Sequence, residues 1–107
     1  MAKFMIEASY SAEGLKGLHK DKSAGRKAAV AKAAEALGGK LEAYYFALGE
    51  HDVVTILDLP DTVSATALAL AASGSGLVRT KTTVLLTVEE TDKALQKKVG
   101  YRAPGKA

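Results

Sequence analysis

Residues 41–59 read LEAYYFALGEHDVVTILDL, and this stretch decides the fold. Residues 41–48 and residues 53–59 are both rich in β-branched, aromatic and other apolar side chains, which favours two β-strands. Gly49 and Glu50 lie between the two strands, and a glycine at such a point favours a tight turn. The stretch therefore predicts a β-hairpin.

The second strand of this hairpin is apolar on both of its faces. Its alternating residues are Val53, Thr55 and Leu57 on one face and Val54 and Ile56 on the other. An antiparallel sheet with helices on one side and water on the other needs only one apolar face per strand. We therefore expect helices to cover one side of this strand and a second chain to cover the other.

The chain before the hairpin predicts one strand and one helix. Residues 3–10 alternate apolar and polar side chains, as a strand with one buried face does. Residues 11–22 contain two glycines and predict a loop with at most one helical turn. The helix that follows ends at about Leu37, where Gly38-Gly39 is a stop signal. Its expected buried stripe consists of Val30, Ala33, Ala34 and Leu37.

The chain after the hairpin predicts a second helix. Pro60 ends the hairpin strand, and Asp61 or Thr62 caps the helix. The stripe expected to face the sheet consists of Val63, Ala67, Leu70 and Ala71. Residues 73–76, SGSG, follow this helix and predict its C-terminal end. They do not predict a phosphate loop, because the glycines of such a loop precede a helix.

A last strand and a third helix complete the pattern. Residues 77–86, LVRTKTTVLL, alternate as a strand does. Thr87 and Glu90 form a capping box, in which each side chain satisfies a free backbone amide of the other residue. This capping box predicts a helix that ends at about Lys98.

The order strand, helix, hairpin, helix, strand is the ferredoxin-like βαββαβ plan of the α+β class. It predicts a four-stranded antiparallel sheet with the first and third strands in the middle, both helices on one face and an extra C-terminal helix. The chain of 107 residues suits one domain. We assign residues 1–100 to the domain and residues 101–107 to a C-terminal tail.

Composition and charge exclude several classes of protein. The absence of cysteine excludes a disulfide scaffold and a thiol nucleophile. The net charge of +3 is spread over the expected helices and is too sparse for a nucleic-acid surface. We see no signal peptide and no apolar run long enough to cross a membrane, so we expect no membrane partner and a cytoplasmic location. The two histidines, far apart in the sequence, predict no metal site.

The sheet face without helices is the expected functional surface. It would expose apolar residues such as Met5 and Phe46, and exposed apolar patches mark interfaces or ligand sites. Pairing of two such faces predicts a homodimer or larger homo-oligomer, with a cavity between the sheets. The residues expected to line this cavity and bind a small molecule are Glu7, Glu42, Tyr44, Arg79 and Lys81.

Three segments resemble the GYD domain family: ASYSAEGLKGL at residues 8–18, GGKLEAYYFALGEHDVVTILDLPD at residues 38–61 and LVRTKTTVLLT at residues 77–87. The family is named for a Gly/Tyr/Asp signature at the hairpin turn. Gly49 and Asp52 match this signature, and His51 stands at the tyrosine position. The resemblance implies a ferredoxin-like fold of the dimeric α/β barrel type. That superfamily includes cofactor-independent oxygenases, haem-handling enzymes and ligand-sensing modules.

The leading functional hypothesis is a small-molecule-binding module, and the sequence leaves open whether it is an enzyme. One alternative is a cofactor-independent oxygenase or isomerase that uses His51, Tyr44 or Glu7 as its acid or base. The other is a structural oligomerisation module. No cofactor is required by the sequence, and haem ligation by His51 is a lesser alternative.

Overall fold

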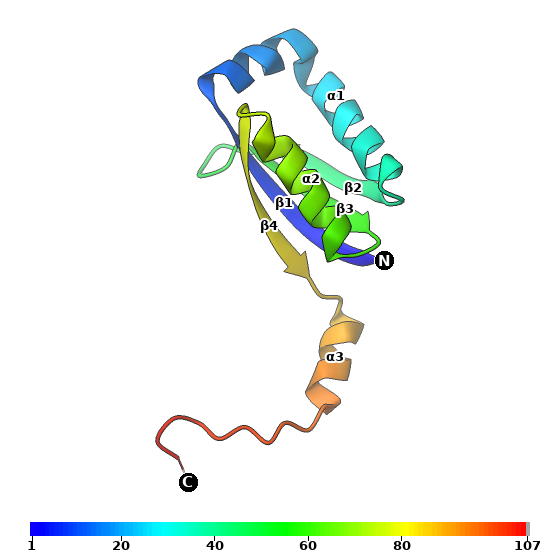
Figure 1. Cartoon of the computed structure of the whole chain (residues 1–107), viewed down its shortest axis with the longest axis vertical. Helices are drawn as coiled ribbons and strands as arrows, with labels where there is room; N and C mark the ends of the chain where they lie inside the picture. Colours follow the sequence, from blue (N-terminus) through cyan, green and yellow to red (C-terminus); the bar gives the residue numbers. More distant parts are fainter. Residues whose placement is uncertain (107) are drawn as a thin grey trace.

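A computed structural model of the chain describes residues 1–106, so Ala107, the last residue of the predicted tail, lies outside the described residues. The elements are β1 (Ala2–Tyr10), α1 (Ala12–Ala36), β2 (Lys40–Phe46), β3 (Val53–Leu59), α2 (Thr62–Gly74), β4 (Val78–Leu85) and α3 (Val88–Gln96). This order confirms the predicted α+β fold with a βαββαβ core and an extra C-terminal helix (Figure 1).

The four strands form one antiparallel sheet in the order β2-β3-β1-β4. The first and third strands are central, as the ferredoxin-like plan predicts. Both α1 and α2 lie on the same side of the sheet (Figure 1). The opposite side, which we call the open face, has no helix over it in the described part of the chain.

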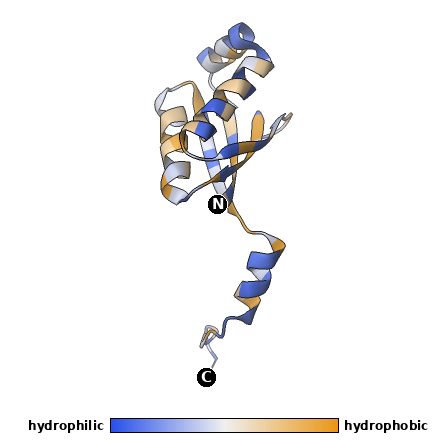
Figure 2. Ribbon diagram, turned by 90° about the vertical axis from the view of Figure 1, so that its right-hand side faces the viewer, coloured by the Kyte–Doolittle hydropathy of each residue, from blue (hydrophilic) through white to orange (hydrophobic). Residues whose placement is uncertain are grey.

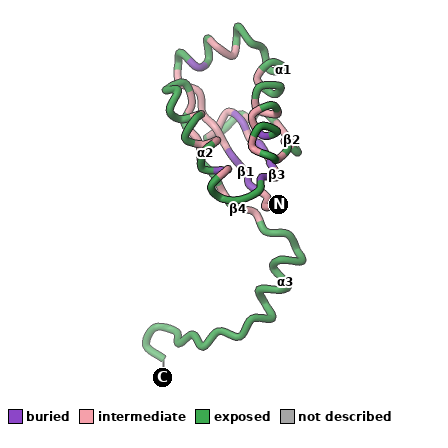
Figure 3. The backbone as a smooth tube through the Cα atoms, turned by 45° about the vertical axis from the view of Figure 1, so that its right-hand side comes forward, coloured by how far each residue is buried: buried purple, intermediate pink, exposed green. Residues whose placement is uncertain are grey.

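The core lies between the sheet and the two helices. Phe4 of β1 and Leu57 and Leu59 of β3 are fully buried, and Ile6 of β1, Ala34 of α1 and Ala65 of α2 complete the cluster. Buried residues gather on the two central strands in Figure 3. The small side chains on the helices let α1 and α2 approach the sheet closely, as expected for the alanine-rich stripe of α1.

The prediction of a loop over residues 11–22 is wrong, because α1 already begins at Ala12. The Ser11 side chain caps this first segment by accepting a hydrogen bond of 3.0 Å from the Gly14 amide. Ser11 in turn donates its own amide to the Leu77 carbonyl at 2.9 Å. The helix is kinked at Lys22, whose φ of 66° is left-handed. These tertiary contacts outweigh the low helix propensity of the two glycines.

The predicted sheet-facing stripe of α2 is also wrong. The residues of α2 that turn to the sheet are Ala65, Leu68, Ala69 and Ala72, whereas Val63, Ala67, Leu70 and Ala71 are exposed. This helix is apolar around most of its circumference, so periodicity alone does not select a face. Packing selects the face with more alanines, which leaves Val63 and Leu70 74% and 67% exposed.

The hairpin contains a β-bulge that the sequence pattern does not reveal. Leu41 and Ala43 pair with adjacent residues of β3, so Glu42 is an extra residue. Beyond the bulge the alternation is reversed, and Tyr44 and Phe46 face the helices instead of the open face. The connection to β3 covers residues 47–52, which is longer than the predicted tight turn.

The third helix lies away from the rest of the molecule (Figure 1). The predicted capping box is present, with hydrogen bonds of 2.9 and 3.1 Å between Thr87 and Glu90. No residue of α3 is buried, and its surface is mostly hydrophilic (Figures 2 and 3). Across residues 1–106, no helix is both long enough and apolar enough to span a membrane.

Candidate functional site

In each strand, every second side chain points to the open face. Because Phe4, Ile6 and Leu57 are buried beneath the helices, their sequence neighbours point to the open face. The open-face residues of the three strands β1, β3 and β4 are Lys3, Met5, Glu7, Ser9, Val54, Ile56, Asp58, Arg79, Lys81, Thr83 and Leu85. The uncharged residues Met5, Ile56 and Thr83 occupy the middle of the face, and the charged side chains stand toward its two ends.

Three of the predicted ligand-binding residues gather at one end of this face. Glu7 is directly opposite Lys81 on β4, and Ser9 is directly opposite Arg79. Side chains paired in this way have Cβ atoms about 4.5–5.5 Å apart. The register thus places one carboxylate, one hydroxyl and two cations within one small area.

His51 joins this area from the β2–β3 connection. Its Nδ1 lies 3.2 Å from Ser9 Oγ, a hydrogen-bond distance at which the tautomer of the ring decides the donor. Its Nε2 lies 3.9 Å from Glu7 Oε2. The His51 and Glu7 side chains are only 20% and 19% exposed. We call Glu7, Ser9, His51, Arg79 and Lys81 the polar cluster.

Hydrogen bonds made by Asp52 hold His51 in this position. The Asp52 carboxylate accepts a hydrogen bond of 2.8 Å from the Tyr10 amide, and the Asp52 amide donates to the Ala8 carbonyl at 2.9 Å. The Asp52 carbonyl accepts from the Ala47 amide at 2.8 Å, which closes the connection. Asp52 therefore anchors the connection to β1, and its neighbour His51 is held over Ser9.

Glu42 is not part of the polar cluster. It forms an ion pair with Lys3, which also contacts Asp58 at 2.9 Å. These two hydrogen bonds, first the one to Glu42 and then the one to Asp58, raise the pKa of the Lys3 ammonium. Lys3 precedes Glu7 by four residues of β1, or about 13 Å. The five residues predicted to bind one ligand are thus divided between the two ends and the two faces of the sheet.

Tyr44 lies on the helix side, so its predicted place on the open face is wrong. The bulge at Glu42 places it opposite the buried Thr55. Its ring packs edge to face against Phe46, with ring centroids 5.5 Å apart. Burial raises the pKa of the Tyr44 hydroxyl far above its ordinary value, and the neighbouring Tyr10 adds to this effect. A phenol that stays protonated at neutral pH is a hydrogen-bond donor and a poor general base.

Ser9 is a member of the cluster that the sequence did not single out, although strand alternation puts it on the same face as Glu7. Strand alternation alone supports its position beside Arg79, whereas its contact with His51 depends on the conformation of residues 47–52. Both nitrogens of His51 face protein oxygens, so ligation of a haem iron would displace either Ser9 or Glu7. Among residues 1–106 there is no group of three histidine or acidic side chains placed to hold a metal ion.

Comparison with known proteins identifies a family and nothing finer. The family model described as GYD domain matches residues 4–95, which include β1 through most of α3. No curated protein and no solved structure matches the chain.

Proposed function

The chain belongs to the GYD domain family, and from this premise we propose that it is a homodimer that binds a small molecule between two paired sheets. The observation that carries this proposal is the open face itself. It combines an apolar centre with the polar cluster at one end, and no helix within residues 1–106 lies over it.

The apolar centre supports a second copy as the covering partner. Met5 on β1 is directly opposite Ile56 on β3, and Val54, two residues before Ile56 on the same face, is opposite Glu7. A two-fold axis would place this strip against the same strip of the partner, so one patch serves both subunits. Pairing the two sheets at the usual spacing of about 10 Å removes these side chains from water.

The polar cluster supports a small polar or anionic ligand. Arg79 and Lys81 supply two cations against the single carboxylate of Glu7, and Ser9 and His51 supply neutral hydrogen-bonding atoms. Tyr45 is 69% exposed on the same side of the sheet, opposite Val54, and offers an aromatic surface. A covering second sheet would exclude water and strengthen contacts to the charged groups.

Sedimentation equilibrium and native mass spectrometry of the purified full chain test the dimer. We expect wild type to be a dimer and Ile56→Glu to be a folded monomer, because it places a charge in the centre of the paired faces. Val63→Glu is the matched control, since Val63 is an equally apolar but exposed residue of α2. A monomeric wild type would contradict the proposal, as would dissociation by Val63→Glu alone.

The native mass spectrum also tests the ligand. We expect a retained small molecule or, with an added candidate anion, an increase in mass that Arg79→Gln weakens and Lys97→Gln does not. Lys97 lies just after α3, outside the sheet, and this control removes one positive charge as the test variant does. If Arg79→Gln and Lys97→Gln bind the added anion equally well, the polar cluster is not the binding site.

A second candidate function, acid–base catalysis, is favoured by the contacts of His51 with Ser9 and Glu7. A histidine held between a hydroxyl and a carboxylate can accept a proton and return it to another atom. The test follows the mass of a retained ligand over time with wild type and with His51→Gln. A product formed only by wild type would support catalysis, whereas a ligand left unchanged by wild type would leave binding alone.

A further inference from the structure

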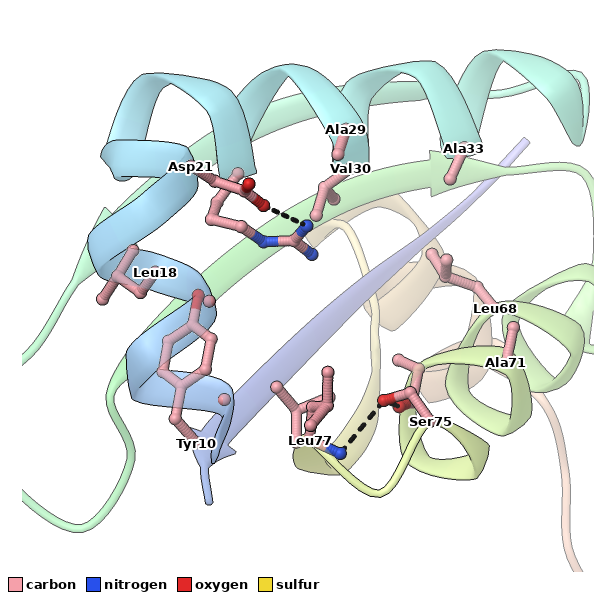
Figure 4. A pocket seen from close by; sticks show the side chains of 15 residues that line it. Tyr10, Leu18, Asp21, Ala29, Val30, Ala33, Leu68, Ala71, Ser75 and Leu77 are labelled. Carbon is pink, nitrogen blue, oxygen red and sulfur yellow. Dashed lines mark hydrogen bonds and ion pairs between the residues drawn. The ribbon is translucent and has the colours of Figure 1, made fainter. Parts of the chain in front are cut away.

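A cavity of about 370 Å³ lies on the other side of the sheet, between α1 and α2 (Figure 4). Its walls come from both helices, and the C-terminal end of β1 and the start of β4 close it below. Ligand pockets commonly measure about 300–1,000 Å³, so this space suits a compact small molecule. We call it the helix cleft, lined among others by Tyr10, Arg26, Ala29, Ala33, Ala71 and Ala72.

The helix cleft exists because small side chains face each other across it. Ala29 and Ala33 project from α1, and Ala71 and Ala72 lie on α2. Alanine is too short to fill the space between two helices, and apolar interiors are otherwise close-packed. α1 is kinked at Lys22, and its two parts run in different directions (Figure 1).

One end of the helix cleft carries hydrogen-bond donors. Arg26 lines this space together with Val30 and contacts Asp21, and Figure 4 shows the Tyr10 ring pointing toward the end of the cleft where Asp21 lies. Arg26 contacts Asp21 at 3.4 Å, a weak hydrogen bond that leaves other N–H groups of the guanidinium without this partner.

A smaller recess continues from the cleft and is lined by Tyr10, Arg26 and Tyr44. The Tyr44 hydroxyl, a phenol that is protonated at neutral pH, adds a donor to those of Arg26 and Tyr10. The site therefore pairs apolar alanine walls with a donor-rich end.

We propose that the helix cleft binds a small carboxylic acid with a ring-sized apolar body, whose carboxylate is held by Arg26 and the Tyr10 and Tyr44 hydroxyls. A guanidinium matches a carboxylate in a planar, two-bond geometry. A ligand group with one negative charge suits this end better than a phosphate dianion does. The Asp21 carboxylate lies beside Arg26 and would repel the second negative charge. This site is separate from the polar cluster, and its existence does not depend on the dimer.

The test is an NMR titration of the full-length, ¹⁵N-labelled protein with benzoate as the probe and benzyl alcohol as its uncharged analogue. We expect saturable shifts at amides around the helix cleft, such as those of Val30 and Ala72, and weaker binding of benzyl alcohol. Arg26→Gln should weaken benzoate binding by about tenfold to a hundredfold, the effect of a lost charge-assisted hydrogen bond. Arg102→Gln, the same change in the C-terminal segment, should leave the affinity unchanged.

Two further variants keep the test decisive. Ala33→Leu fills the helix cleft and should abolish the shifts while the protein stays folded, and Tyr44→Phe should weaken benzoate by about twofold to tenfold. Four results would overturn the proposal: no saturable shift, shifts confined to open-face amides such as that of Val54, full binding by Ala33→Leu, or equal binding of benzoate and benzyl alcohol. Because the open-face variant Arg79→Gln leaves the helix cleft intact, it separates this proposal from the inter-sheet site.

Discussion

The two faces of the sheet are made by the same four strands and yet differ in almost every physical property. On the covered face, Phe4 and Leu57 are fully buried and pack against two helices. On the open face, their neighbours Met5 and Ile56 are only partly buried, and charged residues stand at both ends. β3 therefore carries enough apolar surface to pack against a layer on each side of the sheet. Helices α1 and α2 of the same chain form one of these layers.

The largest effect is expected from truncation in the covered layer. Leu57→Ala should lower the free energy of unfolding by about 2–5 kcal/mol, because it leaves a cavity in a fully buried site. Ile56→Ala, one residue away, should cost clearly less in the monomer, since its side chain is partly exposed there. Chemical denaturation at low protein concentration measures both. Equal losses would break the distinction between the faces.

The next effect concerns how closely α1 is docked. Gly14→Ala should cost about 1–3 kcal/mol, because the added methyl group would overlap the Leu77 carbonyl oxygen. Gly17→Ala is the control on the same helix, with no atom near the added methyl group. We expect it to be neutral or slightly stabilising. Thermal unfolding of both variants measures the difference, and similar melting temperatures would mean that the first part of α1 is not held against β4.

A smaller, pH-dependent effect is expected at the start of α2. The Asp61 carboxylate accepts a hydrogen bond of 2.8 Å from the Ser64 amide, which lowers the pKa of Asp61 below its ordinary value of 3.8. The stability it contributes is therefore complete above that value and is lost as the pH falls through the lowered pKa. Asp61→Asn keeps a capping side chain without the charge. The melting temperatures of the two proteins should differ by a constant amount above about pH 4, and this difference should shrink as the pH falls through the lowered pKa of Asp61.

The smallest effect on global stability is expected from α3, which covers neither face. Thr87→Ala removes the capping hydroxyl, so the Cα chemical shifts of residues 88–96 should become less helical. The midpoint of global unfolding should not change, because no residue of α3 is buried. A lower midpoint would show that α3 packs against another surface in solution.

Much of the fold could be predicted because its signals are local. The alternation in β1 and β3, the caps at Asp61 and Thr87, and the left-handed Gly38 after α1 each depend on a few neighbouring residues. The bulge at Glu42 could not be predicted in this way. It exists only in the pairing of β2 with β3, and it moved Tyr44 and Phe46 to the helix side.

The candidate site also has one part that local sequence signals predict and one part that depends on contacts between distant residues. Strand alternation was enough to place Glu7, Arg79 and Lys81 on one face, because β1 and β4 pair without irregularity. The contact of His51 with Ser9 requires the conformation of the β2–β3 connection. That conformation depends on bonds from Asp52 to a strand more than forty positions earlier in the chain. The helix cleft depends on which faces α1 and α2 present to each other, and the sequence pattern predicted the wrong buried face for α2.

The hydrogen bond from the Tyr10 amide to Asp52 has a consequence for thermodynamic coupling. Ser9 contacts His51 on the open face, the Tyr10 ring lines the helix cleft, and Ser11 caps α1. Three consecutive residues thus connect both proposed sites through one backbone segment that Asp52 holds. A ligand that moves this segment by binding at the helix cleft changes the affinity of the open face for its own ligand. Thermodynamic linkage requires that a ligand on the open face changes the affinity of the helix cleft by the same factor.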